Sequence, residues 1–134
     1  MYTSAQALLD GVVAQKASLI DLILDNEKEL TRRSAREIYA RLETTLQVME
    51  ESAQKALHEA LPTHGGLIEG NARRQYAHAQ GKSICGAALN RMMAYALSGS
   101  ETNASMGRVC AAPTAGACGI LPSVLLYLGE IRTH

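Results

Sequence analysis

The sequence of 134 residues contains no tryptophan and no phenylalanine, so its only aromatic side chains are five tyrosines. This length is typical of one domain. Without large aromatic rings, a hydrophobic core must be built mainly from Leu, Ile, Val, Met and Ala side chains. The composition therefore predicts one modest, largely aliphatic core.

An excess of charge of either sign is also absent. The 13 basic residues are balanced by 13 acidic residues, which gives a formal net charge of zero. Proteins that bind nucleic acid usually carry a basic patch on one face. Here the doublets at 32–33 and 73–74 are isolated, and we interpret them as solvated helix ends. The sequence therefore indicates no nucleic-acid partner.

The sequence has few cysteines and no long apolar run. Its three cysteines are an odd number with no disulfide pattern, as expected for thiols that stay reduced in the cytosol. The N-terminal residues lack the positive region of a signal peptide. The apolar run 119–128 is about half of the ~20 residues that span a bilayer. We expect a cytoplasmic protein without a membrane partner.

Alternation of apolar and polar residues, the signal of a half-buried strand, is missing as well. The fold class predicted is all-α, a multi-helix domain with no substantial sheet. Apolar residues recur at helical spacing over 8–13 and again over 19–24, where they indicate either a buried helix or a bent continuation. Ser34 and Glu37 fit a capping box, which predicts a helix of about 25 residues that reaches Leu57. Pro62 ends this helix.

Residues 62–82 are a polar connector with little periodicity, and a further helix is predicted over 84–97. The Ser-Gly-Ser sequence at 98–100 is expected to break that helix, with Ser100 capping a short helix that ends near Gly107. The next helix is predicted to begin at 119–121, because proline at 122 is tolerated only near a helix start.

The sequence Gly-Lys-Ser at 81–83 looks like the end of a phosphate-binding loop. The full motif requires a glycine at position 76 and a preceding strand, and neither is present. We interpret the segment as a helix start, with Ser83 as the cap and Lys82 in solvent. Lys82 could still contact a substrate carboxylate.

Cys110 and Cys118 are eight residues apart, with a proline between them. Zinc and iron–sulfur sites usually show closer pairs and further ligands. We therefore interpret both as small buried apolar residues and retain them only as weak candidate metal ligands.

The turn at 113–119 is the strongest candidate site. Its small residues and bare backbone N–H groups, placed before an apolar helix, would suit a carboxylate. Close helix–helix packing also requires Gly and Ala. The spacing alone does not separate these two interpretations.

Residues 103–122, which read NASMGRVCAAPTAGACGILP, closely resemble the N-A-[AS]-M-G-x-[IV]-x-[AT]-x-P-T-[AN]-G segment of iron–sulfur-dependent L-serine dehydratase α chains. Upstream, GKSICG at 81–86 is similar to the G-K-S-x-S/C-G stretch of that family, and LQVME at 46–50 to its L-x-V-M-E helix. The resemblance extends in order over residues 5–128.

This resemblance implies an ammonia-lyase of amino-acid catabolism and gluconeogenesis that converts L-serine to pyruvate and ammonia. The family uses a [4Fe–4S] cluster as a Lewis acid and no pyridoxal phosphate. A related iron–sulfur lyase acting on another small amino acid such as cysteine, and a non-catalytic helical interaction module, are the alternatives.

The sequence departs from the family pattern in what it does not contain. The G-C-Q-x-E and C-D-P-V-x-G…P-C segments that carry the cluster cysteines are absent, as is the S-S-S-H-T segment of the β domain. We therefore expect residues 1–134 to be the N-terminal part of an α-chain domain, with the cluster ligands outside it. The expected partners are the C-terminal half of the α chain, a β chain or β domain, and the substrate L-serine.

Apolar side chains on nearly every side of the last helix agree with this interpretation, since such a helix belongs in a core. Alone, the chain is expected to be inactive, and to be poorly soluble or oligomeric. The chemistry of the residues and their placement suggest a substrate site. Its candidate residues are Lys82, Ser83, Asn103, Thr114, Ala115 and Gly116.

Overall fold

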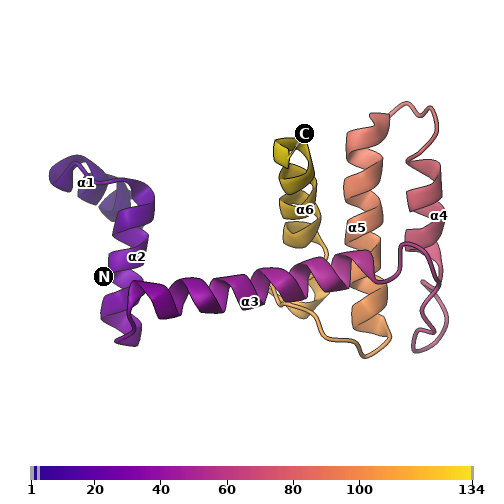
Figure 1. Cartoon of the computed structure of the whole chain (residues 1–134), viewed down its shortest axis with the longest axis horizontal. Coiled ribbons are helices and arrows are strands. Elements are labelled where there is room, and N and C mark those ends of the chain that lie inside the picture. The colour runs from indigo at the N-terminus through magenta and orange to yellow at the C-terminus, as the bar shows by residue number, and fades with distance from the viewer. Residues whose placement is uncertain (1, 3, 134) are drawn as a thin grey trace. The chain divides into compact units, whose positions relative to one another are not determined.

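The computed structural model describes residue 2 and residues 4–133 (Figure 1). The α-helices are α1 (Ala5–Gln15), α2 (Leu19–Thr31), α3 (Ala35–Gln54), α4 (Asn71–His78), α5 (Gly86–Ala104) and α6 (Ile120–Thr133), and a short 3-10 helix, η1 (Ala115–Ala117), precedes α6. No strand occurs among these residues, so the all-α prediction is confirmed. The chain forms two compact units, Met1–Thr44 and Thr45–His134, and each is described by itself.

In the first unit, a serine side chain stabilises the start of each helix. The Ser4 side chain caps α1, and Ser18 forms a capping box with Asp21 at α2. The capping box predicted at α3 is confirmed: the Ser34 N–H donates to the Glu37 carboxylate at 2.8 Å, and the Glu37 N–H donates to Ser34 Oγ at 3.3 Å. These bonds to Ser34 hold the pKa of Glu37 below its ordinary value.

The apolar set at 19–24 forms the separate helix α2 and does not continue α1. Of this set, Leu22 is buried, whereas Ile20 and Ile23 are exposed. The two helices are separate because α1 ends at Gln15, where the C-cap residue Lys16 has a left-handed backbone, and Ser18 caps the start of α2. The helix predicted to have about 25 residues is α3, with 20 residues.

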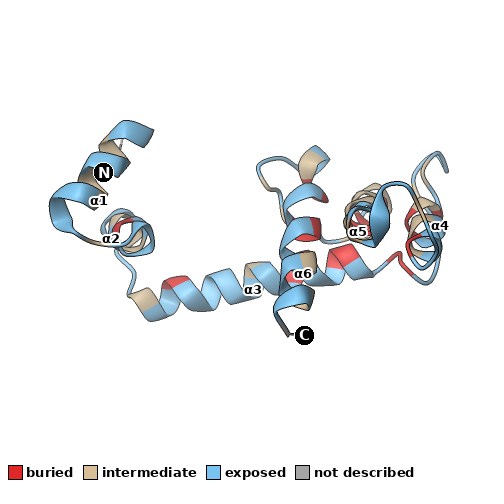
Figure 2. Ribbon diagram, turned by 90° about the horizontal axis from the view of Figure 1, so that it is seen from above, coloured by how far each residue is buried: buried red, intermediate tan, exposed pale blue. Residues whose placement is uncertain are grey.

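The second unit is organised around α5, which α4 and α6 both contact (Figure 1). Its core consists of Ala53 and Leu57, at and just beyond the end of α3, together with Ala94 and Tyr95 of α5. The partly buried Tyr76 and Leu126 pack against this cluster from α4 and α6. Figure 2 shows buried residues in α4, α5, α6 and the end of α3. The largely aliphatic core that the composition predicts is therefore present, with one buried tyrosine.

The predicted break at 98–100 is wrong, because α5 continues through it to Ala104. Ser98 is buried, where its hydroxyl accepts from the Ala56 N–H at 2.9 Å and donates to the Ser52 carbonyl at 3.0 Å. A Cβ built on Gly99 would lie 3.0 Å from the Cα of Gly119, so the two segments approach closely and a side chain at 99 would push them apart. Tertiary packing thus overrides the weak helix propensity of these residues.

No short helix begins at Ser100 either. Its hydroxyl donates to the carbonyl of Ala96 within α5, and the residues that follow belong to the same helix. Beyond α5, the predicted helix start at 119–121 is confirmed, since α6 begins at Ile120.

The segment 62–82, which the pattern describes as a polar connector, contains the helix α4. A carboxylate far along the chain holds the start of this helix. Glu101 is fully buried and accepts hydrogen bonds from the Gly70 N–H at 3.1 Å and the Ala72 N–H at 2.7 Å. Because this support comes from α5, local periodicity could not reveal α4.

By length and composition alone, residues Ala115–Arg132 could cross a membrane. The core helix of a soluble protein meets the same criterion. The regular helix α6 has 14 residues. At about 1.5 Å per residue it extends about 21 Å, short of the ~30 Å hydrocarbon core of a bilayer.

Candidate functional site

The turn before α6 has an exposed part formed by Thr114, Ala115 and Gly116. Thr114 is the N-cap of η1, and its hydroxyl accepts from the Ala117 N–H at 3.3 Å. The side chain of Asn103, near the end of α5, donates from Nδ2 to the Ala115 carbonyl at 3.2 Å. In the part of the chain that the structure describes, the N–H groups of Ala115 and Gly116 have no hydrogen-bond acceptor.

The second part of the same turn is packed tightly against α5. Cys118 and Gly119 are both buried. A Cβ built on Gly119 would lie 2.2 Å from the Ala96 carbonyl oxygen, so no larger residue fits there. Close helix packing is therefore confirmed for Cys118 and Gly119. Anion binding at 114–116 stays a prediction.

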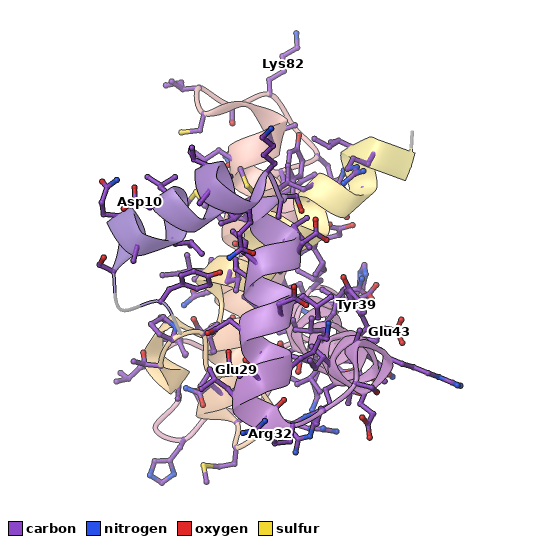
Figure 3. All side chains as sticks on the ribbon, turned by 90° about the vertical axis from the view of Figure 1, so that its left-hand side faces the viewer. Asp10, Glu29, Arg32, Tyr39, Glu43 and Lys82 are labelled. Atoms are coloured by element: carbon purple, nitrogen blue, oxygen red, sulfur yellow. The ribbon has the colours of Figure 1, made fainter. Side chains whose placement is uncertain are left out.

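Lys82 and Ser83 lie in the loop that leads into α5, whereas Asn103 lies near the other end of that helix (Figure 1). At about 1.5 Å per residue, 20 residues of helix correspond to about 30 Å. The Lys82 side chain extends away from the ribbon (Figure 3). The structure thus brings Asn103 together with the turn at 114–116, and does not bring Lys82 and Ser83 to them.

The sequence predicts that Ser83 caps α5, and this prediction is wrong. The N-cap residue is Cys85, and no side chain makes the capping bond. The hydroxyl of Ser83 instead accepts a hydrogen bond from Nδ2 of the buried Asn90, whose Oδ1 accepts from Nε2 of Gln75 at 2.8 Å. Asn90 therefore fixes the loop before α5 against α4.

The three cysteines do not converge. Cys85 is exposed at the start of α5, Cys110 is half-buried, and Cys118 is buried, with its thiol 3.6 Å from the Gly99 carbonyl. Burial raises the pKa of the Cys118 thiol, which disfavours the thiolate that a metal requires. Among the described residues, no group of three or more His, Cys, Asp and Glu side chains could hold a metal. The donor set of these residues does not fit a [4Fe–4S] cluster.

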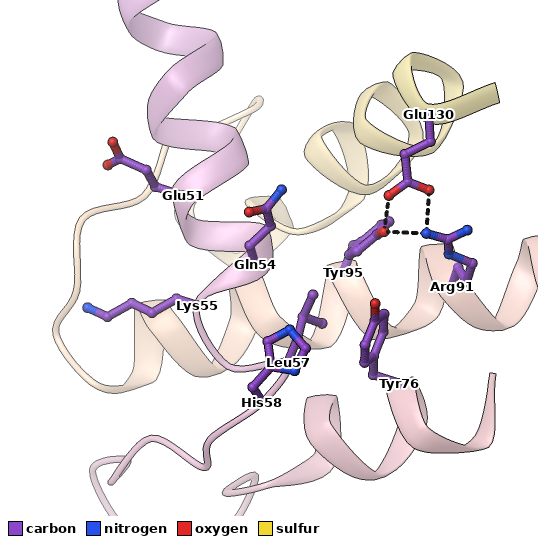
Figure 4. Close-up of a pocket in the computed structure, with 9 residues that line it drawn as sticks. All are labelled: Glu51, Gln54, Lys55, Leu57, His58, Tyr76, Arg91, Tyr95 and Glu130. Carbon is purple, nitrogen blue, oxygen red and sulfur yellow. Dashed lines mark hydrogen bonds and ion pairs between the residues drawn. The ribbon is translucent and has the colours of Figure 1, made fainter. Parts of the chain in front are cut away.

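A polar pocket that the sequence did not predict opens between the end of α3 and helices α4, α5 and α6 (Figure 4). Its volume is about 630 Å³. The Tyr95 hydroxyl donates to Glu130, and Nη2 of Arg91 lies 2.8 Å from the Glu130 carboxylate and 3.3 Å from the Tyr95 hydroxyl. The other lining residues are Glu51, Gln54, Lys55, Leu57, His58 and Tyr76.

Burial, and then the hydrogen bond to Glu130, raise the pKa of Tyr95 to about 12. The pKa of Arg91 is raised by its hydrogen bond to Tyr95. The spacing of Arg91 and Tyr95, four residues apart on one helix, is visible in the sequence. Their partner Glu130 lies 35 residues after Tyr95 on another helix, and no local pattern identifies it. The Tyr95–Glu130 hydrogen bond and the Arg91–Glu130 ion pair join α6 to α5.

The family model described as "Serine dehydratase alpha chain" matches residues 14–133. The chain is 39% identical to the L-serine dehydratase alpha chain of Peptoniphilus asaccharolyticus over 131 residues, which cover 97% of this chain and 45% of that protein. It is 30% identical to the probable L-serine dehydratase alpha chain of Bacillus subtilis (strain 168), covering 97% of this chain and 43% of that protein. A shorter match of 38 residues, 60% identical, relates 28% of the chain to 8% of L-serine dehydratase TdcG of Escherichia coli (strain K12).

The chain therefore spans less than half the length of the first two of these relatives. No solved structure matches it significantly.

Proposed function

Because the chain belongs to the serine dehydratase alpha chain family, we propose that it forms part of an L-serine ammonia-lyase, which converts L-serine to pyruvate and ammonia. The observation that carries this proposal is the match over residues 14–133, which includes the whole exposed turn and the helix before it. The relatives are named for L-serine, and the proposal extends that substrate to this chain.

Within the enzyme, we assign this chain one wall of the substrate site. The N–H groups of Ala115 and Gly116 would donate to the substrate carboxylate, and the hydroxyl of Thr114 would add a third donor. Two or three such donors suit a carboxylate, since hydrogen bonds to an ionised acceptor are stronger than neutral ones. Small residues at 115 and 116 let a ligand reach the backbone.

Asn103 has two roles in this proposal. Its Nδ2 donates to the Ala115 carbonyl, which fixes the turn. Its Oδ1 remains an acceptor, and it would receive a hydrogen bond from the ammonium group of the substrate. Asn103 would thus bind one end of the amino acid while it orients the backbone that binds the other.

Lys82 and Ser83 cannot join this site within one chain. A serine molecule is far shorter than the helix that separates them from Asn103. Asn103 and residues 114–116 would therefore contact the substrate, and Lys82 and Ser83 would make no contact with the same substrate molecule.

We propose that the complete enzyme carries a [4Fe–4S] cluster and no pyridoxal phosphate. Since the described residues do not fit a cluster, its ligands would lie in the part of the α chain outside these residues. The cluster would supply a Lewis acid for the substrate hydroxyl. The remaining part of the α chain and a β chain or domain would complete the site.

The experiment is turnover of L-serine by the complete enzyme assembled with this chain, under anaerobic conditions, followed as pyruvate formed. The Asn103→Ala variant should lower kcat/KM at least tenfold, because it removes a substrate contact and loosens the turn. The matched control is Arg73→Ala, on the exposed side of α4, which should keep the parental value. If the assembled enzyme formed no pyruvate from L-serine, the proposal would be contradicted. A kcat/KM that is unchanged in Asn103→Ala would also contradict it.

A further inference from the structure

Helix α6 has two faces of opposite character. One face packs on α5 through the buried Pro122 and Ser123 and the partly buried Leu126. The other face is aliphatic and exposed, with side chains between 38% and 65% accessible. The residues of this α6 outer face are Ile120, Leu121, Val124, Leu125, Leu128 and Ile131.

The outer face is continuous. At about 100° per residue, its six side chains fall within one side of the helix about 140° wide, and the residues that contact α5 fall on the opposite side. A helix of a globular protein usually presents one apolar stripe to the core and polar residues to solvent. Here the solvent-facing side is aliphatic, and among the described residues the one charged side chain that falls within it is Arg132, at its C-terminal end. A contiguous apolar patch of this kind marks a surface that another element covers.

We propose that the α6 outer face is the surface on which a segment from the remaining part of the serine dehydratase α chain packs. This inference rests on the family membership on which the proposed function also rests. Relatives that match 97% of this chain carry more than half of their own length outside the matched region. The family match itself extends through the whole of the outer face, up to residue 133. The longer proteins therefore supply both this face and the chain to cover it.

The outer face also defines the chemistry of its occupant. Six aliphatic side chains, with Arg132 as the one polar group at the C-terminal end of their sector, call for an amphipathic helix with Leu, Ile or Val at helical spacing. Arg132 at the end of the face calls for a carboxylate at the matching end of that helix. The contact would leave the Arg91–Glu130 ion pair intact, because Glu130 lies on the side of α6 that faces α5.

The experiment is co-purification of the tagged 134-residue chain with the part of the Peptoniphilus asaccharolyticus α chain that lies outside the matched region, expressed together in one cell. The matched region of the Peptoniphilus chain, tagged in the same way, is the positive control for association. The test variant is Val124→Glu combined with Leu128→Glu. The matched control is Leu67→Glu, which places a carboxylate on another exposed apolar residue, 92% accessible, in the loop before α4.

A one-to-one complex is expected, and the double variant should weaken it at least tenfold while Leu67→Glu leaves it unchanged. Circular dichroism should show the parental helix content in both variants, since all the replaced side chains are exposed. Failure of either tagged chain to associate, or a complex that survives the double variant, overturns the proposal. So does a dimer of the 134-residue chain that the double variant abolishes and the added segment does not displace, because a second copy would then occupy the face.

The outcome is separate from that of the proposed function. Binding is measured without turnover, so a complex that forms through α6 supports packing of the segment on the outer face even if the complex makes no pyruvate. If the enzyme assembled with the double variant keeps the segment bound and forms pyruvate at the parental rate, the segment does not pack on the outer face. The proposed function is then unaffected.

Discussion

The side-chain amide of Asn103 donates a hydrogen bond to the backbone carbonyl of Ala115, at 3.2 Å, and so joins the end of α5 to the exposed turn before α6. This bond connects the partly buried Asn103 to the exposed turn at 114–116. The rest of the turn, at Cys118 and Gly119, is held by packing. The shape of the turn should therefore depend on Asn103.

Removal of this bond in the Asn103→Ala variant should loosen residues 114–118. A hydrogen bond contributes about 1 kcal/mol net, so hydrogen exchange in this segment should rise about fivefold. Asn90→Ala is the matched control, because Asn90 supports the loop at the other end of α5. Its effect should appear at 81–86 and not at 114–118. Equal exchange in the turn of both variants would show that Asn103 does not hold it.

Gly119 should be intolerant of any side chain. In Gly119→Ala the new methyl group would meet the Ala96 carbonyl, and α6 would have to move away from α5, at a cost of about 3 kcal/mol in the free energy of unfolding. Gly129→Ala, in the same helix, has nothing within 4 Å of the new Cβ. It should stabilise the protein by about 0.5–1 kcal/mol, because alanine favours a helix. Urea unfolding followed by circular dichroism measures both.

The two serines on either side of Gly99 should respond oppositely to alanine. Ser98→Ala leaves the buried Ala56 N–H without a partner and the Ser52 carbonyl with only the Thr102 hydroxyl, and should cost about 2 kcal/mol. Ser100→Ala removes a bond within α5 only, and should be neutral or slightly stabilising. Thermal unfolding of the two variants distinguishes them. Equal melting temperatures would mean that Ser98 does not fasten α3 to α5.

These serines also show what the sequence could and could not reveal. Patterns within one turn of helix were sufficient for the capping box at Ser34 and for the start of α6, since both depend on neighbouring residues. The continuation of α5 through Ser98 depends on Ser52 in α3 and Ala56 just after it, which lie 46 and 42 residues away along the chain. A hydroxyl that favours a turn locally is satisfied inside the helix once α3 is in place.

The same distinction applies to the candidate site. The exposed turn at 114–116 was identified from its small residues, and its connection to Asn103 spans only 12 residues. Lys82 lies in another segment that resembles the family, at 81–86, but the length of α5 separates it from the turn. A motif match gives no distance between motifs, so the sequence could not reveal this separation. The Tyr95–Glu130 pair was missed because its partners come from different helices.

Glu101 should be essential for the start of α4. The Glu101→Gln variant replaces one acceptor oxygen by an amide that points at a backbone N–H, so one of the bonds to Gly70 and Ala72 is lost in a buried place. We expect a loss of about 2–3 kcal/mol. Glu59→Gln makes the same replacement at an exposed position and should change stability by less than about 0.5 kcal/mol. Guanidinium unfolding curves provide the comparison, and similar midpoints for the two variants would contradict this role.

The buried hydroxyl of Tyr95 should make stability depend on alkaline pH. Its pKa is about 12 in the folded chain and 10.0 in an ordinary tyrosine, so between these values the folded state holds a proton that the unfolded state has released. The contribution of Tyr95 is therefore fully present below pH 10 and is lost as the pH rises toward 12, by at most about 1.4 kcal/mol per unit. Glu130 strengthens this dependence, because ionised Tyr95 would face its carboxylate.

Urea midpoints measured from pH 9 to 12 test this dependence. The Tyr95→Phe variant cannot release the proton, so its midpoint should fall less steeply than that of the parental chain above pH 10. Tyr39→Phe is the control, since it removes a tyrosine whose ring is exposed, and it should keep the parental slope. Parallel curves for Tyr95→Phe and the parental chain would mean that the Tyr95–Glu130 bond opens in solution. Helix α6 would then be held to α5 by the Gly119 contact and the apolar packing of Leu126.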